Sequence, residues 1–182
     1  FVATVGAISE IGAIPVFVDC DDTFCMNCDL IEEVITEKTK AIVPVHFTGY
    51  MTDMRKVIGL AEKYEIPVVE DACLAILASL DGHNAGTWGQ TGAFSLHPLK
   101  NINVWSDGGV IVTNSSELCE NLKLLRNHGL SDRNTVELLG YNSRLDTLQA
   151  VVGSWLLPQA ENITQKRIYN AEYLDRLLSV LE

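Results

Sequence analysis

The feature that most constrains this sequence is a short apolar run that stops abruptly on two carboxylates. Residues 68–69 are both valine, and Glu70 and Asp71 follow them directly. A second apolar run at residues 91–97 is followed by Lys100, which lies 29 positions after Asp71. Ligands of open α/β sheets sit beyond the carboxyl ends of the strands. The pattern therefore predicts that a carboxylate and an amine meet at one edge of a sheet.

Strands and helices alternate along most of the chain. Apolar runs bounded by glycine and polar residues predict strands at 14–19, 41–45, 66–69, 91–97 and 109–113. Apolar residues at helical spacing predict helices at 29–36, 52–64 and 114–129, with Asp29 and Thr52 as the caps of the first two, and a helical last third with a kink at Pro158. This alternation predicts an α/β layered fold with a largely parallel sheet.

Composition excludes several classes of function. The chain has 182 residues, 47% of them apolar, which is enough for one domain with a substantial core. Its formal charge of −11, with no basic cluster, argues against a nucleic-acid partner. Because no apolar run is long enough to cross a bilayer, we expect no membrane partner. An odd number of cysteines, five, is typical of reduced thiols and predicts a cytoplasmic location.

Three side chains near the predicted strand ends have the chemistry of a pyridoxal phosphate site. Lys100 supplies the amine for a Schiff base, and Asp71 an anion that keeps the pyridine nitrogen protonated. Ser95 supplies a hydroxyl donor for the phosphate. The alternative from the residues alone is a surface lysine, an aspartate that caps the next helix and a turn serine.

The sequence disfavours two other kinds of site. Cys25 and Cys28 have the spacing of a metal-ligand pair, but zinc needs four ligands and no second pair follows, so we predict no metal. A nicotinamide-binding fold is disfavoured because no predicted strand leads into a glycine-rich turn. The glycines at 108–109 precede a strand instead.

Several motifs follow one another along the chain. They are Phe1-Val2-Ala3-Thr4, Pro15 to Asp19, Glu70-Asp71-Ala72, Gly92 to Ser95 with Lys100-Asn101, Asp107 to Asn114, Arg126 to Gly129, and Gly140 to Arg144 with Leu148 to Ala150. Together they resemble the motifs of the DegT/DnrJ/EryC1/StrS family of pyridoxal-phosphate-dependent sugar aminotransferases. The resemblance covers nearly the whole chain. It implies the three-layer α/β/α large domain of fold-type I transferases. Residues 1–150 would be part of that cofactor-binding domain, and 151–182 a long helix leading toward a C-terminal small domain. We expect the chain to be a fragment that lacks the N-terminus and that small domain.

The resemblance also implies roles for individual residues. Lys100 would carry pyridoxal 5'-phosphate and shuttle the proton during catalysis, and Asp71 would pair with the pyridinium nitrogen. Ser95 would bind the phosphate, and Asn142 would reach the phosphate bound in the neighbouring subunit, so that a homodimer shares its active sites. Phe1 would stack on the cofactor ring.

His46 has two interpretations. By the resemblance it would border the substrate pocket. By its place in the sequence it is equally a histidine that is hydrogen-bonded at a strand end.

The family resemblance implies an enzyme that moves an amino group from glutamate to a keto sugar, usually nucleotide-linked, in polysaccharide or natural-product biosynthesis. A free keto sugar acid or a keto-cyclitol is an alternative acceptor. One departure from the family pattern is Leu74, which stands where a glutamine or histidine usually approaches the cofactor's ring hydroxyl. Leu74 keeps open a different hypothesis, a catalytically silent paralogue with a regulatory or scaffold role. The dehydratase branch of the family has histidine in place of the lysine, so Lys100 favours transamination.

Overall fold

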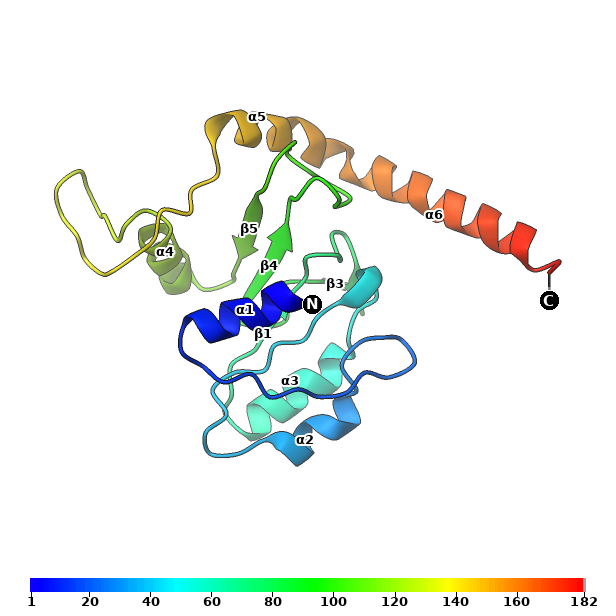
Figure 1. Ribbon diagram of the computed structural model, residues 1–182, viewed down its shortest axis with the longest axis horizontal. Helices are drawn as coiled ribbons and strands as arrows, with labels where there is room; N and C mark the ends of the chain where they lie inside the picture. Colours follow the sequence, from blue (N-terminus) through cyan, green and yellow to red (C-terminus); the bar gives the residue numbers. More distant parts are fainter. Residues whose placement is uncertain (182) are drawn as a thin grey trace. The chain divides into compact units, whose positions relative to one another are not determined.

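The chain folds as two compact units in a computed structural model that describes residues 1–181 (Figure 1). The first unit contains residues 1–94 and 111–116. The second contains residues 95–110 and the chain from Glu117 onward. The predicted α/β class is confirmed, because both strands and helices form and the sheet contains parallel pairing.

Six α-helices and five strands are found among the described residues. The α-helices are α1 (Val2–Glu10), α2 (Ile31–Val34), α3 (Met54–Lys63), α4 (Ser116–Leu125), α5 (Thr147–Leu156) and α6 (Ala160–Leu178). The strands are β1 (Val69–Asp71), β2 (Ser79–Leu80), β3 (His83–Asn84), β4 (Thr91–Ser95) and β5 (Gly109–Val112). Short 3₁₀ helices are found at Cys28–Leu30, Phe47–Gly49 and Leu157–Gln159.

The main sheet has the strand order β1-β4-β5. Strands β1 and β4 run parallel, with Glu70 opposite Gly92 and Asp71 opposite Ala93. The strand predicted at 66–69 forms at Val69–Asp71 instead. It begins later because Pro67 has no N–H and the Val68 amide donates to the Gln90 side chain. The pairing therefore extends through the two carboxylates, and Asp71 is the last residue of its strand.

Two predicted strands do not form regular ladders. Residues 41–45 lie beside β1, but only Ile42 and Val45 form bridges, since Pro44 between them cannot donate a hydrogen bond. The strand predicted at 14–19 was wrong. Among the described residues this segment pairs with no strand. Ile14, Val16 and Phe17 are exposed, Phe17 at 73%, whereas Val18 packs against the core of the first unit. An apolar run alone does not show which strand will pair with it.

Two predicted helix caps were also wrong. The helix expected from Asp29 begins as a 3₁₀ turn at Cys28, and the Asn27 side chain caps it by accepting from the Asp29 amide. The residue before α3 is Asp53, whereas the Thr52 hydroxyl donates to the Val45 carbonyl. In both cases the expected side chain bonds elsewhere, Asp29 to Lys56 and Thr52 to the Val45 carbonyl, and Asp53 makes no side-chain capping bond in place of Thr52.

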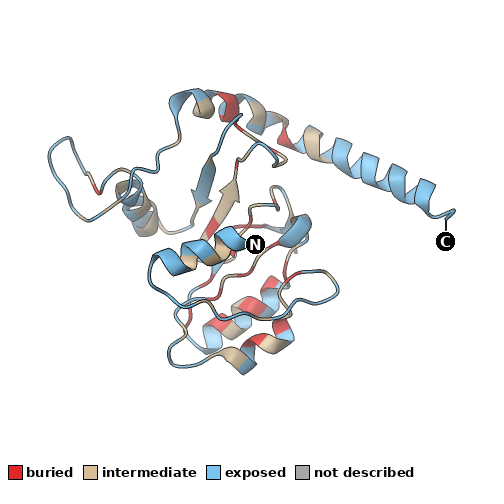
Figure 2. Ribbon diagram, in the orientation of Figure 1, coloured by how far each residue is buried: buried red, intermediate tan, exposed pale blue. Residues whose placement is uncertain are grey.

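The main core of the first unit forms around α3. One face of this helix buries Met54, Val57 and Ala61, as the alternating colours along α3 show (Figure 2). These side chains pack with Ile42 and Val68 from the chain on the sheet side. The buried face explains why a helix of this length is stable here.

The second unit is built on a loop and two helices. The chain leaves β4 at Ser95, and Leu96 exchanges backbone hydrogen bonds with Gly108 and Val104, which closes the loop that carries Lys100. Helix α5 packs Gly153 near the Val104 side chain. The break predicted at Pro158 is confirmed by the 3₁₀ turn between α5 and α6. None of the helices described here is long and apolar enough to span a membrane.

Candidate active site

Asp71 lies at the carboxyl end of β1, where the sequence places a functional carboxylate. Its Oδ2 accepts a hydrogen bond of 2.6 Å from the Thr4 hydroxyl, and its Oδ1 accepts one of 3.2 Å from the Cys73 amide. These two hydrogen bonds fix the carboxylate from two sides, and the residue is half-buried. Thr4 belongs to a sequence motif, but only the three-dimensional structure indicates that its hydroxyl contacts Asp71.

Lys100 lies on a tight turn that starts at Ser95. The Ser95 hydroxyl accepts from the His97 amide, and the His97 ring accepts from the Leu99 amide. The Lys100 amide donates to the His97 carbonyl at 2.8 Å. These local hydrogen bonds make His97 the centre of the turn, and the Lys100 side chain is half-buried. Ser95 follows Ala93, the register partner of Asp71, by two residues.

Asn142 belongs to a short bridge in the second unit. Its backbone pairs in antiparallel fashion with Asn127. The Arg144 guanidinium donates from Nε to Asn142 Oδ1 at 3.0 Å and from Nη1 to Asn127 Oδ1 at 3.2 Å. The Asn142 side chain is exposed, so it is accessible to a ligand or another chain.

The carboxylate of Glu70, which precedes Asp71, is fully buried and holds together separate segments of the first unit. Oε2 accepts from the Gly86 amide at 2.8 Å and lies 3.0 Å from His46 Nε2. Oε1 accepts from the amides of Trp88 at 2.7 Å and Gly89 at 2.8 Å. Burial raises the pKa of this carboxyl, but the His46 bond and the three backbone amides outweigh burial and hold the pKa below its ordinary value.

The loop that Glu70 holds passes very close to β4. A Cβ atom added to Gly92 would lie 2.2 Å from the Gly86 Cα. Gly86 itself has a φ of +81°, which side chains with a Cβ rarely adopt. Glycine is thus required at both positions for the loop and β4 to pack together.

His46 is fully buried, and its ring is hydrogen-bonded on both sides. Nδ1 accepts from the Thr52 amide at 3.3 Å, so the ring proton lies on Nε2 and is donated to Glu70. The backbone amide of His46 also donates to the Asp71 carbonyl at 3.0 Å. These contacts are those of a histidine that is hydrogen-bonded at a strand end, which is the second of the two interpretations of His46 given by the sequence.

Phe1 and Leu74 lie in exposed positions. Phe1 immediately precedes α1 and is 83% exposed. Leu74 follows Cys73 and is 36% exposed. Both residues belong to the first unit, as does Asp71. Ser95, Lys100 and Asn142 belong to the second.

The thiols of Cys25 and Cys28 bond to backbone carbonyls. The Cys25 thiol donates to the Tyr50 carbonyl, and the Cys28 thiol lies near the carbonyls of Met26 and Asp53. Burial, with a smaller contribution from the Asp53 charge, raises the pKa of Cys28 to about 11. Among residues 1–181, no three histidine, cysteine or acidic side chains are grouped in a way that could hold a metal ion.

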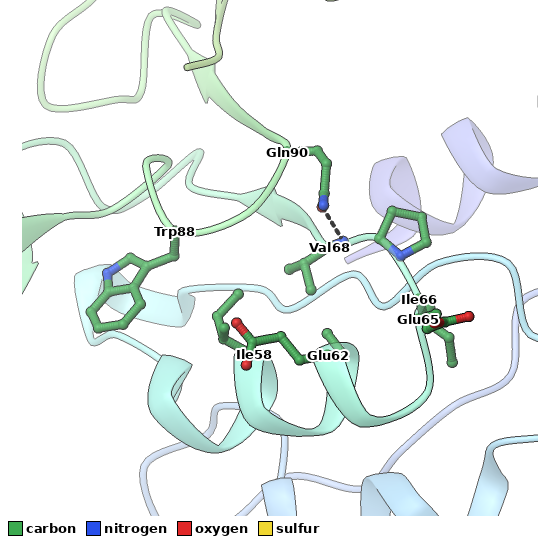
Figure 3. A pocket seen from close by; sticks show the side chains of 9 residues that line it. Ile58, Glu62, Glu65, Ile66, Val68, Trp88 and Gln90 are labelled. Carbon is green, nitrogen blue, oxygen red and sulfur yellow. Dashed lines mark hydrogen bonds between the residues drawn. The ribbon is translucent and has the colours of Figure 1, made fainter. Parts of the chain in front are cut away.

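An open groove of about 430 Å³ lies elsewhere in the first unit, between α3 and the chain that enters β1 (Figure 3). Ile58, Glu62, Val68, Trp88 and Gln90 are among its lining residues. The groove contacts the residues before β1, whereas Asp71 ends that strand. It is therefore separate from the predicted catalytic carboxylate.

The chain is similar in sequence to bacterial proteins whose roles are named. A "Pleiotropic regulatory protein" of Geobacillus stearothermophilus is 42% identical over 179 residues, which cover 98% of this chain and 48% of that protein. The "UDP-N-acetyl-3-dehydro-alpha-D-glucosamine 3-aminotranferase" of Acidithiobacillus ferrooxidans is 46% identical over 153 residues, covering 84% of this chain and 42% of that protein. The chain thus spans under half the length of these two relatives.

A solved structure confirms the fold. The crystal structure of NtdA from Bacillus subtilis "with bound cofactor PMP" matches all of this chain and 42% of that one, with a TM-score of 0.88 and 34% identity. The sequence profile of the DegT/DnrJ/EryC1/StrS aminotransferase family matches residues 1–182. The chain therefore belongs to the DegT/DnrJ/EryC1/StrS aminotransferase family.

Proposed function

We propose that the full-length protein is a pyridoxal-phosphate-dependent aminotransferase that moves an amino group from glutamate to a nucleotide-linked keto sugar. The observation that carries this proposal is the pairing of two neighbouring parallel strands, of which one ends on Asp71 and the other runs into Ser95 and Lys100. The sugar aminotransferase of Acidithiobacillus ferrooxidans supports the substrate class. We place the reaction in the biosynthesis of polysaccharides or natural products, in the cytoplasm.

The donor set fits the cofactor. An amine, a carboxylate, a hydroxyl and a carboxamide are the groups that bind an aldehyde, a pyridinium nitrogen and a phosphate. When bound, the cofactor supplies an electron-withdrawing ring that stabilises negative charge on the substrate carbon. The PMP in the NtdA structure is the aminated form of the same cofactor, which supports the assignment.

Each residue has a separate task in this proposal. The Lys100 amine would hold the cofactor by its aldehyde, and Nζ, once the amine of the amino donor has replaced it there, would take the proton from the substrate carbon and return it. The Asp71 carboxylate, held by Thr4 and Cys73, pairs with the protonated ring nitrogen. The Ser95 hydroxyl donates to the phosphate. Phe1 stacks on the ring.

Two further assignments concern support and assembly. We propose that Asn142 donates to the phosphate bound by a second copy of the chain, so that the enzyme is a homodimer with shared active sites. His46 we assign to support of Glu70 and β1, because its ring is buried and bonded on both sides. Residues 1–150 then form part of the cofactor-binding domain, and residues 151–182 lead toward a C-terminal domain.

A regulatory protein without catalysis is the second candidate. The relative from Geobacillus stearothermophilus is named a pleiotropic regulatory protein, which favours this candidate. Leu74 also favours it, because a leucine side chain offers no hydrogen bond to a cofactor.

Absorbance spectroscopy of the full-length protein separates the two candidates. We expect pyridoxal phosphate to produce a visible band that glutamate bleaches, and we expect Lys100→Ala to form no such band. Lys38→Ala, which changes an exposed lysine, is the matched control. A wild-type protein without the band would reject the aminotransferase and support the regulatory candidate. ¹⁵N-labelled glutamate with a panel of nucleotide-linked sugars, free keto sugar acids and keto-cyclitols then identifies the acceptor.

A further inference from the structure

We propose that Arg144 is a positioning residue that turns the Asn142 amide so that its NH₂ group faces a phosphate. This inference rests on the proposed function, in which Asn142 binds the phosphate of the cofactor. The proposed function gives no role to the Arg144 side chain. Arg144, Asn142 and Asn127 all belong to the second unit.

The chemistry of the two side chains fixes the orientation of the amide. A guanidinium group has five N–H donors and no acceptor, so the atom of Asn142 that lies 3.0 Å from Arg144 Nε is an oxygen. With its oxygen engaged by the arginine, the amide presents its nitrogen on the opposite side. A phosphate accepts hydrogen bonds only, so it is bound by the NH₂ group and repelled by the oxygen.

The arginine is itself held in place. Its Nη1 donates to Asn127 Oδ1 at 3.2 Å, and the Asn127 and Asn142 backbones are bridged. Among residues 1–181, no hydrogen bond from the Asn142 NH₂ group is found. One amide oxygen thus anchors the guanidinium, the guanidinium orients the second amide, and the NH₂ group is left as the donor.

Backbone hydrogen bonds hold this segment without help from Arg144. The Tyr141 amide donates to the Leu125 carbonyl at 2.7 Å, and the His128 amide donates to the Tyr141 carbonyl at 2.8 Å. The Ser143 amide donates to the Arg126 carbonyl at 3.0 Å. We therefore expect that removing the Arg144 side chain frees the Asn142 amide to rotate while the backbone keeps its path.

The test compares the affinity of the full-length protein for pyridoxal phosphate with its affinity for pyridoxal, which lacks the phosphate. We expect Arg144→Met to weaken pyridoxal phosphate binding about tenfold, the value of a charge-assisted hydrogen bond, and to leave pyridoxal binding within about twofold. Asn127→Ala keeps the charge of Arg144 but removes the hydrogen bond that holds its guanidinium group. We expect this variant to bind pyridoxal phosphate about threefold more weakly. Arg133→Met, at an exposed arginine, is the control for lost charge.

A double variant separates positioning from direct contact. If Arg144 acts through Asn142, Arg144→Met has no further effect on pyridoxal phosphate affinity once Asn142 is alanine. A loss that persists in the Asn142→Ala background would overturn the inference, because Arg144 would then bind the phosphate directly. An equal loss for pyridoxal and pyridoxal phosphate would overturn it as well. A wild-type protein that binds neither compound rejects the proposed function itself.

Discussion

His46 Nε2 lies 3.0 Å from Glu70 Oε2, and neither side chain is accessible to solvent. The same carboxylate accepts three backbone amides of the loop 86–89. A buried charge is tolerated where hydrogen bonds replace the lost water, and the Glu70 carboxylate accepts these three amides and the His46 ring N–H. The pair therefore joins the segment around His46, the strand that ends on Asp71 and the loop 86–89.

Replacing Glu70 is expected to destabilise the protein strongly. Glu70→Gln keeps the size of the side chain but places an NH₂ group against backbone donors. Leaving buried N–H groups without their acceptor in this way costs about 3 kcal/mol of unfolding free energy. Denaturant titration of the full-length protein measures the change. The control is Glu62→Gln, an exposed glutamate on α3, for which we expect a change within about 0.5 kcal/mol. Equal stability of the two variants would contradict this role for Glu70.

The same carboxylate predicts a pH dependence. The pKa of Glu70 is lower in the folded protein than its ordinary value of 4.5. Its stabilising contribution is therefore complete above pH 4.5 and is lost as the pH falls through the lower folded-state pKa. The stability difference between wild type and Glu70→Gln should be largest near neutral pH and shrink on acidification. Titrations at several pH values check this, and a difference that grows at low pH would refute it.

Thr4 is expected to affect cofactor binding through Asp71. Thr4→Val keeps the shape of the side chain but removes the hydroxyl that donates to Oδ2, so the carboxylate is less firmly oriented. We expect about threefold weaker binding of pyridoxal phosphate, measured by its absorbance. Thr4→Ser retains the hydroxyl and should bind nearly as the wild type does. If the serine and valine variants bind equally, the hydroxyl has no such role.

Two glycines should respond to alanine in opposite directions. Gly92→Ala places a Cβ 2.2 Å from the Gly86 backbone, and we expect a loss of about 3 kcal/mol of stability, with displacement of the loop 86–89. Gly59 lies inside α3, where an added Cβ meets no atom within 4 Å. Gly59→Ala should stabilise the protein by about 0.5–1 kcal/mol because alanine favours helix. Thermal unfolding of both variants provides the comparison.

Much of the fold could be predicted from the sequence where patterns are local. The strands that lead to Asp71 and to Ser95 follow from apolar runs, and the break at Pro158 follows from a missing N–H. Which segments pair as strands depends on residues that are distant in the sequence. The segment 14–19 has a strand-like pattern, yet it joins no ladder among the described residues.

The candidate site was predicted in part. The chemistry of Lys100 and Asp71 is visible in the residue types, and their roles remain predictions. The contact of Thr4 with Asp71 spans 67 positions, and the contact of Arg144 with Asn127 spans 17, so neither follows from spacing. One signal for Glu70 was present, because a glutamate that directly continues an apolar strand needs partners if it is buried with that strand.

Glu70 holds the loop 86–89 through main-chain amides only, which decides which loop positions can be changed in an engineered protein. Because the carboxylate binds backbone N–H groups and no side chain in the loop, a mutant library at the exposed Thr87 removes no contact of Glu70. The contact that it removes is the hydrogen bond from the Thr87 hydroxyl to the Asn84 carbonyl. Glu70 and Gly86, in contrast, belong among the positions kept constant in any such library.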